Sequence, residues 1–238
     1  MPQRIGTPPA NLPRLPGSNA SSRPATTPAV ADATRPGWTP KAKGPRAPIQ
    51  PPASEGEFPK SADGTPIFKQ ADAAWGRLKL GKNLTIAAAG CAMSSSAMAM
   101  SKVSGQLITP KDLDAWLDKN RGYAGDSLDF SRVGLARGLV VSNVNFNLKT
   151  LDKQLGAGKP VVIGVDYKEG SGGGGNGTDH WVCVTGKAVG ADGKARYLAN
   201  DPGTGKEISL TVSQGKLVSD GTGALGKYRS TGEVRFFD

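Results

Sequence analysis

Proline is distributed very unevenly along this chain of 238 residues, and this feature constrains the fold more than any other. Fourteen of the 18 prolines lie in residues 1–60, where aliphatic residues are few. Such a segment cannot bury enough apolar surface to offset the entropy lost on ordering, so we expect residues 1–60 to be disordered or polyproline-like. Residues 61–238 then form one compact domain of about 175 residues, a common size for a single core.

The formal net charge of +10 is spread over the whole chain. Residues 1–60 carry eight Lys and Arg against three Asp and Glu, and the remaining residues carry 22 against 17, so each part has a surplus of five. No run of basic residues is interleaved with aromatic ones, which disfavours a dedicated nucleic-acid interface. We therefore expect weak attraction to acidic partners at most, and no nucleic acid as a partner.

The N-terminus, Met1-Pro2-Gln3-Arg4-Ile5-Gly6, has no apolar core of the kind that secretory signals contain. We expect a protein made in the cytoplasm without a standard signal, whose export would need a specialised secretion system. No run approaches the roughly 20 apolar residues that cross a bilayer, so we expect no membrane insertion.

The spacing of apolar residues changes along the domain from a helical to a strand period. Helices are predicted over 92–103, from the capping pair Thr109-Pro110 onward, over 128–139 and over 148–155. Strands are predicted over 161–167, 180–185, 195–200, 208–212 and 233–237. Because helices come first and antiparallel strands follow, the pattern predicts an α+β fold, with N-terminal helices that carry the nucleophile packed on a C-terminal antiparallel sheet.

Cys91 is one of two cysteines in the chain and directly precedes a predicted helix. A thiol attacks carbonyl carbon as the thiolate, which is favoured at a helix N-terminus by unpaired backbone N–H groups and the helix dipole. The same N–H groups can stabilise a developing oxyanion. Cys91 is therefore a candidate nucleophile, although a small apolar residue in a helix core is the alternative interpretation.

His180 is the only histidine, so it is the only imidazole that could act as the base for Cys91. It begins a predicted strand, and Asp201 ends the next one, where paired antiparallel strands can bring the two side chains together. An acceptor beside a catalytic imidazole holds it in the required tautomer. A structural histidine and a turn-forming aspartate remain the alternatives.

Other chemistry has little support in the sequence. One histidine and two cysteines are too few for the usual soft metal ligands, so we expect no metal and no cofactor. Cys183 lies in an apolar strand and is interpreted as a core residue, and nothing requires a disulfide. The Gly-rich stretch 170–178 lacks the lysine of a phosphate-binding loop and precedes a strand, so it is either a lid of a substrate cleft or a flexible connector.

Several short motifs together resemble the papain-like peptidases related to the double-glycine leader peptidases of bacteriocin exporters. They occur in order over roughly residues 66–205: Gln70, Trp75, Gly90-Cys91 with Ser95 and Ala97-Met98, Thr109-Pro110, Gly158 to Val162, His180-Trp181-Val182 with Gly186, and Asn200-Asp201-Pro202-Gly203. The joint pattern is more specific than any single motif. In many relatives glycine follows the cysteine, whereas here Gly90 precedes Cys91 and Ala92 follows it.

The resemblance implies a papain-like cysteine peptidase that cleaves a peptide bond after Gly or Gly-Gly, with a protein or peptide substrate as its partner. It implies Cys91 as nucleophile, His180 as general base and acid, Asp201 as its orienting partner and the Gln70 side chain as an oxyanion donor. Trp75 and Trp181, together with Tyr123, are candidates for the walls of a narrow substrate cleft.

A basic, proline-rich N-terminal segment joined to one small hydrolase is the layout of toxins that bacteria deliver to one another. An immunity protein covering Cys91 would then be a further partner. The same triad could instead hydrolyse peptidoglycan as an amidase or endopeptidase, deamidate glutamine or transfer acyl groups, because all these reactions pass through a thioester. A catalytically silent peptide-binding module is the alternative from a different class.

Overall fold

The computed structural model describes residues 57–167, 177–221 and 226–238. Most of the predicted disordered segment 1–60 lies outside these residues, as does all but the end of the Gly-rich stretch 170–178. Residues 57–60 are described, and Lys60 forms an isolated antiparallel bridge with Pro66.

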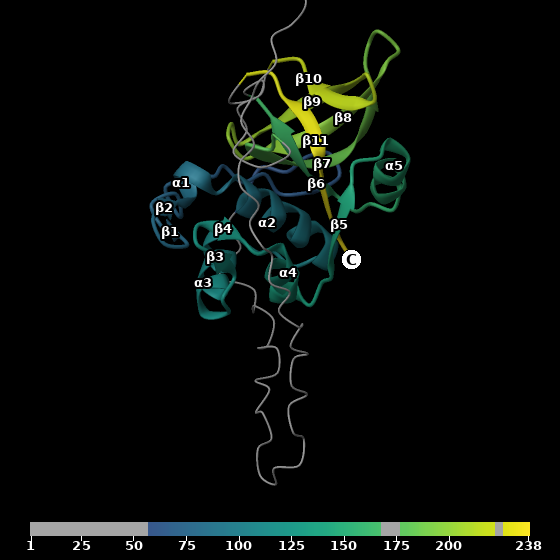
Figure 1. Cartoon of the computed structure of the whole chain (residues 1–238). Coiled ribbons are helices and arrows are strands. Elements are labelled where there is room, and N and C mark those ends of the chain that lie inside the picture. The colour runs from purple at the N-terminus through teal and green to yellow at the C-terminus, as the bar shows by residue number, and fades with distance from the viewer. Residues whose placement is uncertain (1–56, 168–176, 222–225) are drawn as a thin grey trace, which may run out of the picture. The chain divides into compact units, whose positions relative to one another are not determined.

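Six antiparallel strands in succession close into a barrel (Figure 1). The strand β11 pairs with β6 along one edge and with β10 at Arg229, which completes the circle. A register shift between Ser230 and Val234 interrupts the pairing of β11 with β6. The C-terminal part of β11 pairs with β6 again at Val234 and Arg235, and on its other side it pairs with β5 (Val141–Asn145). The barrel strands are β6 (Val161–Asp166), β7 (His180–Val189), β8 (Ala195–Asp201), β9 (Lys206–Ser213), β10 (Lys216–Ser219) and β11 (Arg229–Phe237).

This architecture shows that the predicted fold class was wrong. The molecule is built mainly from a closed six-stranded barrel with few, short helices, and not from a helical N-terminal half packed on an open sheet, so the papain-like α+β assignment does not hold. Strand periodicity predicted segments of five barrel strands but not β10, and it carries no information about the pairing of β10 with β11 that closes the sheet.

Short helices and two small hairpins surround one side of the barrel. The predicted start at Thr109 is confirmed as a capping box with Asp112, followed by Pro110 at the first helical position. The predicted helix over 128–139 is wrong in length, because a single turn is followed by a 3-10 turn that ends at Gly138 in the left-handed conformation. The elements are β1 (Lys79–Leu80), β2 (Leu84–Thr85), α1 (Ile86–Ala89), α2 (Cys91–Ser104), α3 (Pro110–Lys119), β3 (Tyr123–Ala124), β4 (Ser127–Leu128), α4 (Phe130–Val133), η1 (Gly134–Arg137) and α5 (Leu148–Gly156).

Successive side chains of β6 and β7 point to opposite faces of the sheet, and the buried ones therefore belong to two separate cores. One set faces the barrel interior and includes the cross-strand pairs Val161 with Val184 and Ile163 with Val182. The other set faces α2 and includes the pair Val162 with Cys183. The strand pair therefore separates the barrel interior from the helix that begins at Cys91.

In the part of the chain that the structure describes, no helix combines the length and the apolar character needed to span a membrane.

Candidate active site

Strand register brings the side chains of His180 and Asp201 together inside one end of the barrel. His180 pairs with Val165, a residue of the interior core, and so occupies an interior position of β7. Asn200 of β8 pairs with Cys183 on the opposite face, so the next residue, Asp201, turns inward. His180 Nε2 lies 2.8 Å from Asp201 Oδ1, and the two side chains are only 3% and 0% exposed.

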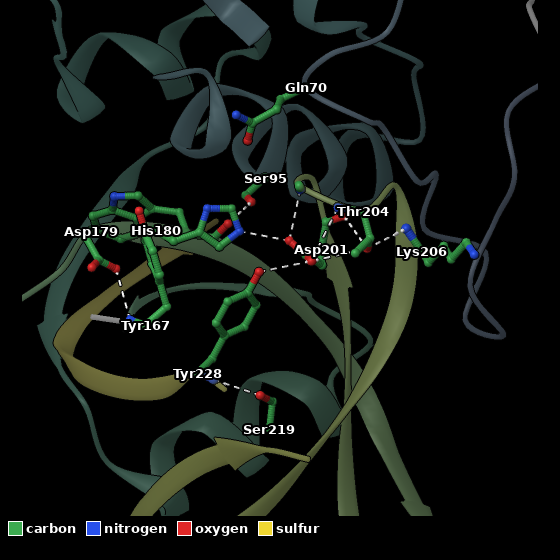
Figure 2. Close-up of polar contacts among 12 residues, drawn as sticks. Gln70, Ser95, Tyr167, Asp179, His180, Asp201, Thr204, Lys206, Ser219 and Tyr228 are labelled. Atoms are coloured by element: carbon green, nitrogen blue, oxygen red, sulfur yellow. Dashed lines mark hydrogen bonds and ion pairs between the residues drawn. The ribbon is translucent and has the colours of Figure 1, made fainter. Parts of the chain in front are cut away.

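Asp201 accepts hydrogen bonds at both carboxylate oxygens (Figure 2). The backbone N–H of Gly203 donates to Oδ1 at 2.9 Å, and the Thr204 hydroxyl donates to Oδ2 at 3.1 Å. The hydroxyl of Tyr228 donates to Oδ2 at 3.2 Å. These donors compensate for the burial of the carboxylate and hold its plane against the imidazole.

Cys91 is the first residue of α2, and its side chain is close enough to the His180 ring to raise the pKa of the imidazole. A carboxylate can only accept, so the Nε2–H of His180 donates to Asp201 and Nδ1 remains for Cys91. Burial is the largest influence on the pKa of His180 and lowers it. The hydrogen bonds and charges of Asp201 and Cys91 together outweigh burial and raise this pKa to about 9.

The N-cap of α2 is Gly90, which supplies no side-chain hydrogen bond to the first turn. A side chain at this position would clash, because a Cβ on Gly90 would lie 2.4 Å from the Ile86 carbonyl oxygen. The glycine thus lets α1 and α2 follow one another closely and leaves the start of α2 without a side-chain cap. Backbone N–H groups in a first helical turn lack partners within the helix and can serve as oxyanion donors.

A pocket of about 470 Å³ opens beside the half-buried Cys91. Trp181 and Phe130 line it, with their ring centroids 5.1 Å apart. The guanidinium of Arg235 lies 4.5 Å from the Phe130 ring and 4.9 Å from the Trp181 ring, and it also bonds Glu233 at 2.6 Å. Cys91 therefore borders a cleft with an aromatic wall, whereas His180 is buried and does not line this cleft.

Gln70 is tied to the site through its backbone, whose N–H donates to the Pro202 carbonyl. Its side-chain Nε2 donates to the Ala87 carbonyl at 2.9 Å. The amide oxygen is buried and has no hydrogen-bond partner among the described residues. The structure therefore places Gln70 near the site, with one amide hydrogen already used by the backbone.

The three aromatic candidates for the cleft walls lie in different places. Trp181 lines the pocket. Trp75 is 2% exposed, packs against Phe58 and Phe68 in the core on the α2 side, and donates its indole N–H to the Lys69 carbonyl. Tyr123 donates to Asp114 at 2.5 Å, next to α3.

Cys183 is fully buried and faces α2, and burial raises the pKa of its thiol. Both cysteines are free. Within the described ranges, no group of three or more His, Cys, Asp or Glu side chains could hold a metal ion.

Sequence reasoning missed three residues that build the site. Thr204 could have been found, because an aspartate followed by Pro-Gly-Thr is a typical turn in which side chains bond nearby backbone groups. Tyr228 and Arg235 carry no motif. Their roles depend on β11, which reaches the site only because the barrel closes.

Comparison with protein-family models and with curated proteins found no match to this chain. The resemblance to leader peptidases therefore rests on the motifs alone, and the functional argument rests on the geometry of the site.

Proposed function

We propose that the protein is a cysteine-dependent amide hydrolase that cleaves peptide bonds through a thioester on Cys91. The observation that supports this most directly is that the chain's only imidazole bonds a buried aspartate through one nitrogen and interacts with Cys91. Cys91 also lines a pocket that is large enough for several substrate atoms. Preference for glycine before the scissile bond, export as a toxin and an immunity partner remain predictions.

Before acylation, His180 Nδ1 has already taken the proton of the Cys91 thiol, so a thiolate lies beside an imidazolium. The thiolate sulfur attacks the substrate carbonyl carbon, and the carbonyl π electrons move to the oxygen. Backbone N–H groups at the start of α2 stabilise the resulting oxyanion. The intermediate collapses, His180 donates its proton to the leaving amine as the C–N bond breaks, and a thioester remains.

Deacylation repeats these steps with water. His180 takes a proton from water as the water oxygen attacks the thioester carbon, and the C–S bond breaks to give the carboxylic acid and the cysteine thiolate, which remains paired with the protonated His180. Asp201 stays ionised throughout and accepts from Nε2–H, which keeps Nδ1 directed at the sulfur.

Alkylation by iodoacetamide between pH 5 and pH 9 tests the nucleophile–base pair without a known substrate. At pH 6 we expect Cys91 to react on the order of 100-fold faster than a free thiol, because less than about 1% of a free thiol is ionised there. The His180→Ala variant should lose this acceleration. Mass spectrometry assigns the labelled site, and the buried Cys183 is the internal control, which should label only after unfolding.

Cleavage itself is tested by exposing bacterial protein extract to the wild type and to Cys91→Ala, and sequencing new N-termini. New termini that depend on Cys91 support proteolysis. If Cys91 is alkylated at the rate of a free thiol, and this rate is the same in His180→Ala, the proposed hydrolase activity is contradicted. A peptide-binding module is then the better explanation.

A further inference from the structure

Tyr228 lies directly beneath the His180–Asp201 pair and belongs to no motif of the sequence (Figure 2). Its side chain is completely buried. Its ring centroid is 5.2 Å from that of His180, and its hydroxyl donates to Asp201 Oδ2 at 3.2 Å. One residue thus contacts both the imidazole and the carboxylate.

The backbone of Tyr228 is held where the barrel closes. Its N–H donates to the Ser219 hydroxyl at 2.8 Å, and its carbonyl accepts from the Ser219 N–H at 3.0 Å. Ser219 ends β10, and Arg229, the next residue after Tyr228, begins β11. The closing pair of strands therefore sets the position of the phenol.

We propose that Tyr228 is a positioning residue, whose hydroxyl orients Asp201 and limits how strongly this carboxylate holds the proton of His180. This inference rests on the proposed function, because it assigns a role within the same site. Tyr228 does not line the pocket at Cys91 and acts only through Asp201 and the imidazole.

Tyr228 can have this effect because its hydroxyl and the His180 ring compete for the negative charge of the same carboxylate. A donor on Oδ2 stabilises the carboxylate and withdraws part of its charge from the opposite oxygen, Oδ1, which faces His180 Nε2. The titratable groups that act on His180 are Cys91 from α2 and Asp201 from β8, with Tyr228 acting on Asp201 from the start of β11. With less negative charge on the Asp201 oxygen that faces it, the imidazolium is a stronger acid and donates its proton more readily to the leaving amine.

The test uses the fact that the tag-free chain has one histidine, so its imidazole gives a single set of signals in ¹H–¹³C NMR. In Tyr228→Phe the ring remains and only the hydroxyl is lost. We expect the pKa of His180 to rise by about half a unit, the size that one neutral hydrogen bond allows. An unchanged or lower pKa would overturn the role of Tyr228.

Tyr197→Phe is the matched control, because it removes another tyrosine hydroxyl that donates to an aspartate, Asp152 at 2.7 Å, away from the site. It should leave the His180 titration unchanged. If Tyr228→Phe does not fold, wild-type protein labelled with 3-fluorotyrosine replaces it. The more acidic phenol is a stronger donor, so the pKa of His180 should fall, and no fall would again overturn the proposal.

The two proposals can fail separately, since the NMR titration requires no turnover. If the rate of Cys91 alkylation does not depend on His180, but the pKa of His180 changes in Tyr228→Phe, the proposed hydrolase activity is contradicted and the role of Tyr228 in the hydrogen-bond network is supported. If alkylation of Cys91 depends on His180, but the pKa of His180 is the same in Tyr228→Phe and the wild type, only the positioning role of Tyr228 fails.

Discussion

The imidazole of His180 joins three structural elements through single contacts. Asp201 comes from β8, Cys91 from α2 and the Tyr228 ring from the residue just before β11, so the charge state of one residue reports on the whole site. Burial alone would favour a neutral ring, and the opposing effect of Asp201 and Cys91 prevails. The imidazolium therefore persists at neutral pH, as a general acid in this mechanism requires.

Asp201→Asn tests the charge of the orienting partner. Because Asp201 raises the pKa of His180, we expect the variant to titrate lower, by roughly 1–3 units, which is the usual effect of losing a close opposite charge. NMR titration of the single histidine measures this. Asp152→Asn, which disrupts an exposed pair with Lys187, should leave the titration as in the wild type. Equal pKa values in Asp201→Asn and the wild type would show that Asp201 only shapes the turn.

At the scale of elements, α3 and the hairpin β3–β4 carry a buried pair that the proposed chemistry does not use. Tyr123 donates to Asp114, which is 5% exposed. Burial raises the pKa of Asp114 to about 6, against the lowering effect of the Tyr123 hydrogen bond, and the charge of Asp118 raises it further. A carboxylate held this way costs stability once it ionises.

The sign of this effect on stability follows from the raised pKa. The folded state binds the Asp114 proton more tightly than the unfolded state, so its contribution is fully present below about pH 4 and is lost as the pH rises to about 6. Asp114→Asn keeps an acceptor for Tyr123 without the charge. We expect it to unfold at a higher temperature than the wild type at pH 7.5 and to lose this advantage at pH 4.

Glu57→Gln is the control for this comparison, since it removes one negative charge from an exposed position outside α3. Melting curves followed by circular dichroism at both pH values measure the difference. An Asp114→Asn variant that is less stable than the wild type at pH 7.5 would show that the pair is net stabilising when ionised.

At the scale of the whole molecule, barrel closure both completes the interior core and delivers Tyr228 to the site. The closing strand β10 has four residues and contributes the buried Leu217 to this core. The Leu217 N–H also donates to the Ser230 hydroxyl of β11 at 3.0 Å. Stability and site geometry therefore depend on the same short strand.

Leu217→Ala should lower the free energy of unfolding by about 2–5 kcal/mol, the usual cost of truncating a buried leucine. Urea titration followed by tryptophan fluorescence measures it. Val189→Ala, at a residue that is 74% exposed on β7, should change stability by no more than about 0.5 kcal/mol. If Leu217→Ala and Val189→Ala lowered the free energy of unfolding by the same small amount, β10 would not be part of the cooperative core.

Much of the local structure could be predicted from the sequence because it depends on neighbouring residues. The capping box at Thr109 follows from its hydroxyl and from Pro110, and five strands of the C-terminal half follow from alternation. The sequence also pointed to Cys91, His180 and Asp201, because thiol, imidazole and carboxylate chemistry needs these residue types on adjacent elements. The predicted helix over 128–139 was wrong in length because Gly138 takes the left-handed conformation and the Leu139 N–H returns to the Gly134 carbonyl, which ends the helical segment.

Only the tertiary structure decided how the strands are connected in space. An alternating pattern is the same in an open sheet and in a closed barrel, since period two describes a strand and not its partner. Closure depends on β10 meeting β11 at Arg229, a contact between segments with no mutual signal in the sequence. For the same reason, the chain alone predicted a nucleophile and its base, and the fold was needed to place Tyr228 beneath them.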